Sequence, residues 1–308
     1  MIFVPIVGSM IRKSLGFRGD GAPQLMYFKG EDFGVRTSPF SFYSGKWELR
    51  GERYFLGKGP YKALIVFFHG LGAGHRAYSR EISALAKEGY LVYAYDNTGC
   101  GISEGTCIGN LAQAALDQKA FFDFLNSDPL AKGLGIYAWG HSWGGYMALT
   151  ALLPEYGVSK SVSMAGFPSV YQAMVSSSPS SAKFKNSILL YQKMKFGKYG
   201  NIDVTSLMNQ TKAKVLYIQD ENDKTCPSQE CLFHFKKEVK NPNVSFWVTQ
   251  NKGHQPYWSN ASVAYYAELK NKYHIFGIKR DLKHEIDYSV LNQDDPKTMK
   301  RIIDFFDN

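Results

Sequence analysis

The stretch around Ser142 constrains the fold more than any other part of the chain. Residues 135–139 are short, apolar and aromatic, as in a buried strand, and residues 146–153 favour a helix. Between them Ser142 lies at the centre of a Gly-x-Ser-x-Gly motif. Gly140 and Gly144 leave the space that a sharp turn needs, because they carry no side chain. A strand, a tight turn and a helix predict a nucleophile elbow, in which Ser142 has a strained backbone conformation.

Strand and helix patterns alternate on both sides of this turn, after a predicted β-hairpin over residues 40–56 with its turn at residues 50–52. Short apolar runs typical of buried strands occupy residues 63–68, 90–95, 161–165, 214–219 and 244–248. Helical patterns lie between most of these runs and at the end of the chain. The alternation predicts an α/β fold with a mostly parallel, doubly wound sheet.

The alternation stops between residues 167 and 212. A serine-rich stretch is followed there by an amphipathic helix pattern over residues 184–196. Residues 169–202 hold five lysines and no acidic residue. We interpret this segment as a small inserted helical cap, the alternative being a long crossover connection. The predicted division of the chain is therefore an N-terminal extension (1–37), an α/β core (38–166 and 213–308) and a cap (167–212).

The composition excludes several other classes of protein. The 308 residues carry a formal net charge of +9, yet no basic run contains interleaved aromatic residues, so a solvated basic surface is favoured over nucleic-acid binding. The four cysteines form no Cys-x-x-Cys pair, which predicts a reducing compartment such as the cytoplasm. We expect neither a transmembrane helix nor a signal peptide, because no apolar run is long enough and the N-terminal basic residues follow the apolar ones.

A serine hydroxyl needs a base and an orienting acid before it acts as a nucleophile. In one known order the acid follows the serine, and the histidine follows the acid. Asp223, just after the strand at residues 214–219, is the predicted acid, with Asp220 as the alternative. His254, after the strand at residues 244–248, is the predicted base.

The oxyanion of such a reaction needs backbone N–H donors that are already in place. The N–H of Trp143, directly after the serine, is one candidate. The second is the N–H of Leu71 in the sequence His69-Gly70-Leu71-Gly72, where glycines let the backbone approach a substrate. The alternative is a tight turn without a catalytic role.

Together these motifs resemble the α/β-hydrolase superfamily, and most closely its capped branch of serine aminopeptidase-like and monoacylglycerol lipase-like proteins. The resemblance covers residues 40–255. The matching motifs lie at residues 69–72, 96–105, 140–145, 223–227 and 253–254. One motif departs from the family pattern, since Thr98 stands where an arginine with a structural role is common.

The resemblance implies carboxylic ester hydrolysis through Ser142, His254 and Asp223, with a small acyl ester as substrate and without a metal or organic cofactor. Two alternatives are a peptidase acting on N-terminal residues, disfavoured because the predicted cap has no acidic residue, and a non-catalytic binding protein. The cap lysines are either solvated or contact a membrane surface. An apolar acyl pocket is predicted from side chains of the cap, namely Tyr171, Met174, Phe184, Tyr191 and Met194.

Overall fold

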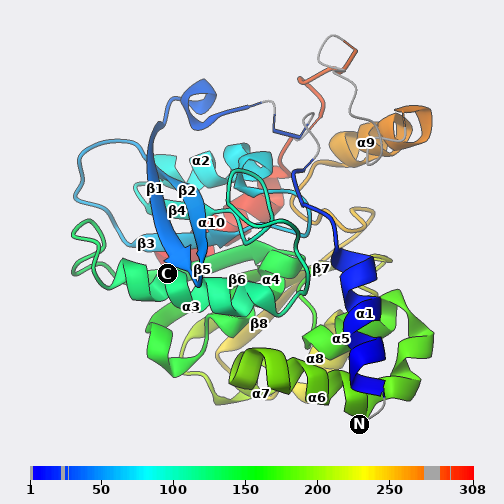
Figure 1. Ribbon diagram of the computed structural model, residues 1–308. Coiled ribbons are helices and arrows are strands. Elements are labelled where there is room, and N and C mark those ends of the chain that lie inside the picture. Colours follow the sequence, from blue (N-terminus) through cyan, green and yellow to red (C-terminus); the bar gives the residue numbers. More distant parts are fainter. Residues whose placement is uncertain (1–2, 22–24, 27, 274–284, 292) are drawn as a thin grey trace.

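In the computed structural model, which describes residues 3–21, 25–26, 28–273, 285–291 and 293–308, eight strands form one sheet (Figure 1). Their order is β1-β2-β4-β3-β5-β6-β7-β8. β2 pairs antiparallel with β1 and with β4, and all other pairs are parallel. The predicted mostly parallel sheet is therefore confirmed. The strands are β1 (Arg36–Ser44), β2 (Trp47–Phe55), β3 (Leu64–Phe68), β4 (Leu91–Tyr95), β5 (Ile136–His141), β6 (Val158–Met164), β7 (Lys214–Asp220) and β8 (Val244–Thr249).

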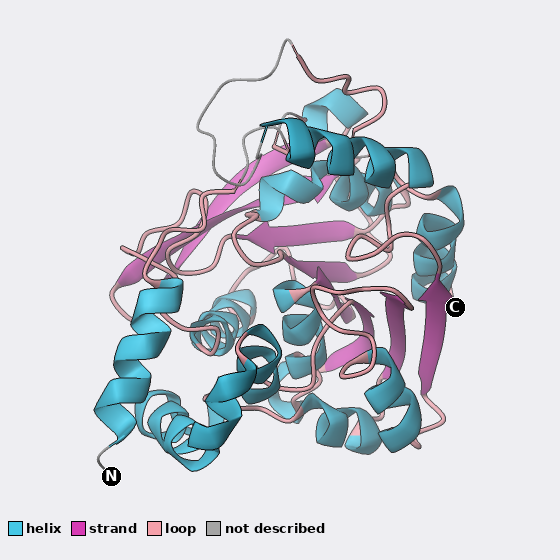
Figure 2. Cartoon of the chain, turned by 90° about the vertical axis from the view of Figure 1, so that its right-hand side faces the viewer, coloured by secondary structure: helices cyan, strands magenta, loops and turns pink. Residues whose placement is uncertain are grey.

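Helices cover both faces of the sheet, as Figures 1 and 2 show. One apolar cluster joins one face to α3 (Gln113–Leu125), α4 (Trp143–Thr150) and α8 (Leu232–Glu238). A second cluster joins the other face to α2 (Ser79–Lys87), α9 (Asn260–Tyr273) and α10 (Pro296–Asp307). Among the described residues, short 3-10 helices lie at Gly30–Phe33, His75–Tyr78, Pro154–Tyr156, Pro179–Phe184 and Gly197–Tyr199. This arrangement is the α/β-hydrolase fold that the sequence predicted.

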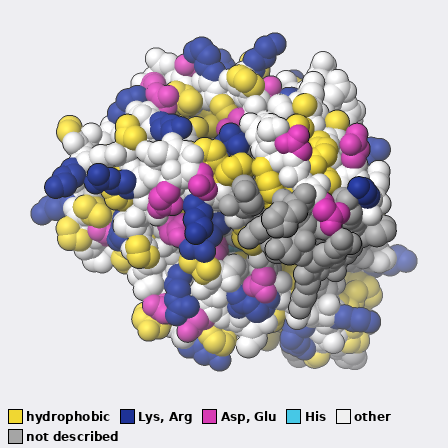
Figure 3. All heavy atoms as spheres, turned by 90° about the horizontal axis from the view of Figure 1, so that it is seen from above, with side chains coloured by type: hydrophobic (Ala, Val, Ile, Leu, Met, Phe, Trp, Pro, Cys, Tyr) yellow, Lys and Arg dark blue, Asp and Glu magenta, His cyan; other side chains and the backbone are white. Residues whose placement is uncertain are grey.

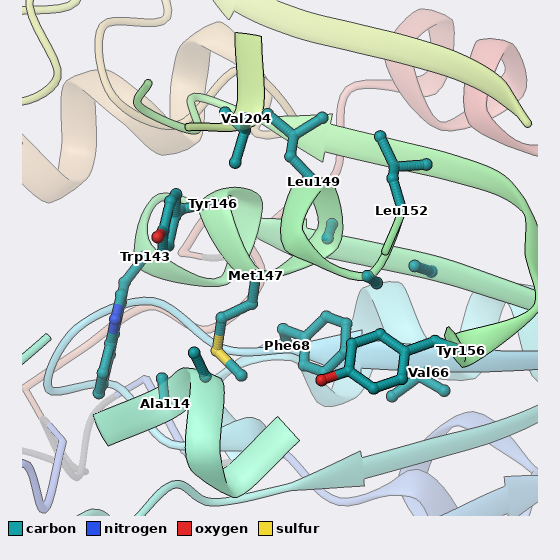
Figure 4. Packing of buried hydrophobic residues seen from close by; sticks show 14 of the residues in the cluster. Val66, Phe68, Ala114, Trp143, Tyr146, Met147, Leu149, Leu152, Tyr156 and Val204 are labelled. Atoms are coloured by element: carbon teal, nitrogen blue, oxygen red, sulfur yellow. The ribbon is translucent and has the colours of Figure 1, made fainter. Parts of the chain in front are cut away.

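The alternation of side chains along β3 explains why both faces are covered. All five residues of this strand are buried. Val66 and Phe68 belong to the cluster on the α3 and α4 side, whereas Ile65 and Phe67 belong to the cluster on the α2 side. Figure 4 shows Phe68 and Met147 of α4 pointing toward one another beneath the elbow helix. A central parallel strand has no solvent-facing side, so its sequence is continuously apolar.

The predicted hairpin exists, but its predicted turn at residues 50–52 is wrong. β1 and β2 are joined at Gly45, which has a φ of 59°. Gly51 instead lies inside β2 and pairs with both Phe40 and Tyr95. A Cβ atom at Gly51 would lie 2.2 Å from the carbonyl oxygen of Ala94. This glycine therefore permits close approach of a neighbouring strand and makes no turn.

Three helices lie between β6 and β7, namely α5 (Val170–Ser177), α6 (Lys185–Phe196) and α7 (Val204–Gln210). α6 agrees with the predicted amphipathic helix, whereas α5 and α7 are additional. The N-terminal helix α1 (Phe3–Leu15) lies beside α5 and α6 in Figure 1. Its buried residues Val7 and Ile11 form a separate apolar cluster with Ile188 of α6. The N-terminal extension thus packs on the segment that was predicted to be the cap.

No helix within the described ranges is long and apolar enough to cross a lipid bilayer. All four cysteines are free thiols, and the cytoplasmic location inferred from the cysteine content stays a prediction. On the face seen in Figure 3, Lys and Arg side chains are interspersed with Asp and Glu side chains and form no continuous basic stripe.

Candidate active site

Ser142 lies on a strained turn between β5 and α4. Its φ and ψ are 60° and −117°, a conformation that residues with a side chain rarely adopt. A Cβ atom at Gly144 would lie 1.9 Å from the carbonyl oxygen of Phe68, and one at Gly140 would lie 2.2 Å from the oxygen of Gly144. Both glycines are thus required for the elbow to pack against β3. The turn presents Ser142 at the carboxyl end of the central strands.

The structure brings Ser142, His254 and Asp223 together. His254 Nε2 lies 2.9 Å from Ser142 Oγ. His254 Nδ1 lies 2.9 Å and 3.2 Å from the two carboxylate oxygens of Asp223. A carboxylate can only accept a hydrogen bond, so Nδ1 carries the proton and Nε2 is left to accept from the serine hydroxyl. This is the protonation pattern that a general base beside a serine needs.

The two candidate acids have different partners. The Asp223 side chain is fully buried, and its carboxylate also accepts from the N–H of Thr225 at 2.9 Å and from Gln219 Nε2 at 3.1 Å. Asp220 makes no hydrogen bond to His254. It accepts from the N–H groups of Asn222 and Lys252, both at 2.9 Å. Asp220 therefore connects the loops after β7 and β8, and only Asp223 lies against His254.

In the loop after β3, hydrogen bonds fix the orientation of the peptide between Gly70 and Leu71. The N–H of Leu71 points away from the groups that bond to the Gly70 carbonyl. Asn97 N–H donates to His69 Nε2 at 3.0 Å, so His69 Nδ1 carries the proton and donates to the Gly70 carbonyl at 2.8 Å. The N–H of Ala73 donates to the same carbonyl at 3.2 Å. In a trans peptide the C=O of Gly70 and the N–H of Leu71 point in opposite directions. Burial lowers the pKa of His69, which favours the neutral ring, and the two hydrogen bonds select its tautomer.

Neither predicted oxyanion donor has another hydrogen-bond acceptor among the described residues. Trp143 is the first residue of α4, so its N–H has no partner within the helix. Its indole N–H donates to the Leu111 carbonyl at 3.0 Å, which fixes the side chain. Leu71, Ser142 and Trp143 all line one small cavity of about 120 Å³, called here the nucleophile cavity. Two free N–H groups beside a serine are the arrangement that a developing oxyanion requires.

A second cavity, of about 230 Å³ and called here the apolar cavity, adjoins the nucleophile cavity. Leu71, Leu111, Ala173 and Ser177 line both. The walls of the apolar cavity come mainly from α1 and from the segment between β6 and β7, and its other lining residues are Val7, Met10, Ile11, Ser14, Leu15, Asn110, Val170, Met174, Ser178, Ser181, Phe184 and Ile188.

Two of the five residues predicted for the acyl pocket line the apolar cavity. Met174 and Phe184 line the apolar cavity, whereas Tyr171 and Tyr191 pack in the cluster between α1 and α6. Met194 is 71% exposed, so its inclusion was wrong. The contribution of α1 to this cavity was not predicted from the sequence.

A groove of about 830 Å³, called here the lysine-lined groove, also reaches Ser142 and His254. Leu71 borders it as well, and the side chain of Leu71 is 43% exposed. Lys224, Lys252 and Lys270 line this groove, and no described Asp or Glu does so. Lys252 is buried and donates to the Trp258 carbonyl at 2.7 Å. Ser142 thus borders both the nucleophile cavity and the lysine-lined groove.

A buried ionic cluster supports the loop after β4. Asp96 accepts from the backbone N–H of His75 at 2.6 Å and from His75 Nδ1 at 2.8 Å. Glu52 lies 3.3 Å from His75 Nε2. Burial opposes the charged imidazolium, but the two carboxylates outweigh it and raise the pKa of His75 to about 9. His75 is therefore a cation at neutral pH, and it stabilises the loop without contacting Ser142.

In the same loop, Thr98 occupies the position at which an arginine is common in the family. Thr98 bonds to the buried Asp117 through its N–H at 2.7 Å and its hydroxyl at 2.9 Å. A guanidinium is nevertheless present, because Arg18 donates to the carbonyls of Gly101 at 2.9 Å, Ser103 at 3.1 Å and Gly105. Arg18 comes from the N-terminal extension, far away in the sequence.

The remaining histidines do not compete with His254 for the role of base. His234, in α8, lies 3.1 Å from the hydroxyl of Thr205. His274 and His284 fall outside the described residues. Within the described part of the chain, no three side chains of His, Cys, Asp or Glu form a group that could hold a metal ion.

Comparison with known proteins connects this site to a family. Residues 59–241, more than half of the chain, match the family described as serine aminopeptidase, S33. A monoglyceride lipase of Saccharomyces cerevisiae is 29% identical over 132 residues. That match covers 41% of this chain and 38% of the lipase, so it spans well under half of this relative.

Solved structures share the fold at lower identity. An esterase of Pyrococcus furiosus aligns with a TM-score of 0.59 and 22% identity, covering 83% of this chain and 94% of the esterase. An acylaminoacyl peptidase of Pyrococcus horikoshii aligns with a TM-score of 0.53 and 22% identity, covering 72% of this chain and 38% of the peptidase. The fold is thus common to esterases and peptidases and does not distinguish between them.

Proposed function

The chain belongs to the serine aminopeptidase S33 family of α/β-hydrolases, and we propose that it is a serine hydrolase that cleaves carboxylic esters. The observation that carries this proposal is the unbroken series of contacts from Asp223 through His254 to Ser142 on the elbow. A binding protein without activity would not need these three groups aligned at 2.9 Å.

In the first half of the proposed reaction, Ser142 Oγ attacks the ester carbonyl carbon and its proton passes to His254 Nε2. The carboxylate of Asp223 stabilises the resulting imidazolium. The negative oxygen accepts hydrogen bonds from the N–H groups of Leu71 and Trp143, each worth on the order of 3 kcal/mol in the transition state. His254 then protonates the leaving oxygen, the bond from carbon to that oxygen breaks, and the acyl group stays on Ser142.

In the second half, water replaces the alcohol. His254 Nε2 takes a proton from the water as it attacks the acyl carbon, and the same two N–H groups receive the oxyanion. The bond to Ser142 Oγ then breaks, His254 returns a proton to the serine oxygen, and the carboxylic acid is released. Every step uses groups that belong to this chain and one water molecule.

The cavities support a substrate with an apolar acyl chain of small to medium length. The apolar cavity adjoins the nucleophile cavity, so an acyl group on Ser142 can extend from one into the other. The lysine-lined groove also reaches Ser142 and has room for the alcohol or another leaving group. We therefore propose that α5, α6 and α7 act as a cap whose inner surface selects the acyl chain.

Peptide hydrolysis is the second candidate. The cap segment has no acidic residue over positions 169–202, but one carboxylate reaches it from outside. Glu230 accepts from Gln172 Nε2 at 2.9 Å and from the hydroxyl of Ser176, which lines the nucleophile cavity. An N-terminal amine would have to compete with these two donors for Glu230, which favours ester substrates.

The exposed surface of α6 supports a further proposal, contact with an anionic lipid surface where apolar esters occur. Lys193 and Lys195 are exposed there, beside exposed side chains of Leu190 and Met194. A lysine near an anionic membrane contributes about 1 kcal/mol of binding free energy. Sedimentation with vesicles containing phosphatidylserine should therefore be weakened by Lys193→Glu and Lys195→Glu. Equal binding to vesicles of phosphatidylcholine alone would contradict this contact.

One experiment tests the enzymatic proposal. The purified protein is treated with a fluorophosphonate and assayed with p-nitrophenyl esters and with aminoacyl amides. We expect covalent labelling that Ser142→Ala abolishes, and ester turnover well above amide turnover. Absence of labelling would favour a binding protein, and faster amide turnover would favour a peptidase.

A further inference from the structure

His141, the residue directly before Ser142, is buried behind the site and has no role in the steps above. Its Nε2 lies 2.6 Å from the backbone carbonyl oxygen of His254, and its Nδ1 lies 2.9 Å from the hydroxyl of Tyr78. Tyr257 packs edge-on against its ring, with centroids 5.0 Å apart. His141 and Tyr78 are each only 4% exposed. The ring is therefore held on both of its nitrogen edges.

The partners determine where each proton lies. A carbonyl oxygen only accepts, so Nε2 of His141 carries a proton. Burial and the nearby His254 lower the pKa of His141 well below its ordinary value, so the ring is neutral and Nδ1 has no proton. The Tyr78 hydroxyl consequently donates to Nδ1, and its oxygen accepts from the N–H of Gly70 at 3.2 Å. These three hydrogen bonds form a series, called here the Tyr78–His141 series. All of its donors point the same way, from Gly70 toward the carbonyl of His254.

Each end of the Tyr78–His141 series lies at a part of the proposed catalytic site. Gly70 directly precedes Leu71, whose N–H is a proposed oxyanion donor. A Cβ atom at Gly70 would lie 2.7 Å from the Tyr78 hydroxyl, so only glycine fits against this hydroxyl. At the other end the loop of His254 is irregular, since Asn251 and Gly253 have φ values of 61° and 56°. Such a loop needs anchors beyond the sheet to fix its backbone.

We propose that Tyr78 and His141 are positioning residues that hold the oxyanion loop and the backbone of His254 in a fixed relation to Ser142. The proposal rests on the serine hydrolase function proposed above. A hydrogen bond to Asp223 already holds the side chain of His254. The hydrogen bond from His141 Nε2–H to the His254 carbonyl holds its main chain as well. The elbow serine is covalently linked to His141, so the serine and its base share one anchor.

Three variants test the two parts of the Tyr78–His141 series separately. Tyr78→Phe removes the hydroxyl, His141→Asn keeps a polar group only near the Nδ1 position, and His141→Gln keeps one near the Nε2 position. We expect Tyr78→Phe and His141→Asn to lower kcat on p-nitrophenyl butyrate by about 10- to 100-fold, because small misplacements at a catalytic centre have effects of this size. KM should stay within about twofold, and His141→Gln should retain more activity than His141→Asn.

A matched control separates positioning from general stability. Tyr93→Phe removes another buried tyrosine hydroxyl, which donates to Asp128 at 2.9 Å in the middle of β4. It should lower the melting temperature as Tyr78→Phe does, but leave kcat within about twofold. Equal losses of kcat in both variants, or an unchanged kcat in Tyr78→Phe, would overturn the positioning role.

A second readout does not depend on catalysis. In nitrogen-15 NMR of the full chain, we expect His141 to be neutral and protonated on Nε2 across the range around pH 6.5. Protonation of this ring near that pH, or the Nδ1–H tautomer, would overturn the inference. Wild-type protein without labelling at Ser142 would overturn the proposed function and the positioning role together, whereas labelled wild type with fully active variants would overturn the positioning role alone.

Discussion

Ala173 is the position at which the proposed path of the acyl chain can be blocked. This side chain of α5 lines both the nucleophile cavity and the apolar cavity, so a larger side chain there would fill the passage between them. Ala173→Phe is therefore expected to leave short acyl esters as substrates and to exclude longer ones. Ala182→Phe is the matched control, because Ala182 is exposed and lines neither cavity.

The size of the effect follows from the volume of the apolar cavity. Its 230 Å³ has room for about seven methylene-sized groups, taking roughly 30 Å³ for each. Each buried methylene contributes about 0.8 kcal/mol, which corresponds to about a fourfold increase in kcat/KM. In the wild type, kcat/KM should thus rise about fourfold per methylene from acetate until the cavity is full. In Ala173→Phe this rise should stop within the first few carbons.

The assay is a series of p-nitrophenyl esters from acetate to dodecanoate, measured below the concentration at which they form micelles. Ala182→Phe should reproduce the wild-type series, and all three proteins should have similar melting temperatures. The reasoning would be refuted if Ala173→Phe kept the wild-type dependence on chain length. It would also be refuted if acetate and octanoate turnover fell by the same factor, because a blocked passage should not affect acetate.

Three further predictions concern the acid, the ionic cluster and the elbow. Asp223→Asn should lower kcat for ester hydrolysis by on the order of 10⁴-fold, whereas Asp220→Asn should mainly lower the melting temperature; equal losses of kcat would contradict the assignment. Because the folded pKa of His75 is about 9 against an ordinary 6.5, its roughly 3 kcal/mol of stabilisation should be complete below pH 6.5 and be lost as the pH rises through 9. Urea unfolding at pH 6 and pH 10 should therefore differ more in wild type than in His75→Gln, and parallel curves would argue against a charged His75. Gly144→Ala should destabilise the fold by about 3 kcal/mol or more in urea unfolding, because its Cβ would lie 1.9 Å from a backbone carbonyl of β3, whereas Gly135→Ala should be nearly neutral.

The positions of the three proposed catalytic residues could be predicted because parallel strands end at one edge of the sheet. β5, β7 and β8 end at His141, Asp220 and Thr249, and Ser142, Asp223 and His254 follow within a few residues. The continuous apolar pattern of buried strands is strong enough to locate these ends in the sequence. The sequence favours Asp223 over Asp220, but the contact with His254 that distinguishes them depends on the turn after β7.

The error in the hairpin shows what local patterns cannot resolve. Arg50-Gly51-Glu52 has the composition of a turn, yet Gly51 lies within β2. The requirement for glycine comes from Ala94 on a neighbouring strand, more than 40 residues away in the sequence. A pattern along the chain reports backbone preference but contains no information about which strand will approach.

The apolar cavity was only partly predictable for a related reason. The apolar periodicity of α1 indicates that one face of this helix is covered, but it does not identify the covering element. In the structure Val7 and Ile11 face Ile188, and Met10 lines the cavity. The residues predicted within 167–212 therefore include part of one wall of the apolar cavity, and α1 forms another part.

The loop after β4 shows that a motif is better defined by its contacts than by its residues. In the family pattern an arginine is common at the position that Thr98 occupies here. From the motif alone, one would expect this loop to lack a guanidinium. The loop has one nonetheless, because Arg18 donates to its carbonyls and Gly19 pairs with it through bonds to Gly99 and Gly101. The segment that supplies Arg18 continues from α1, which forms a wall of the apolar cavity. The N-terminal extension thus joins the apolar cavity to the loop after β4, so a displacement of residues 3–20 would alter both at once.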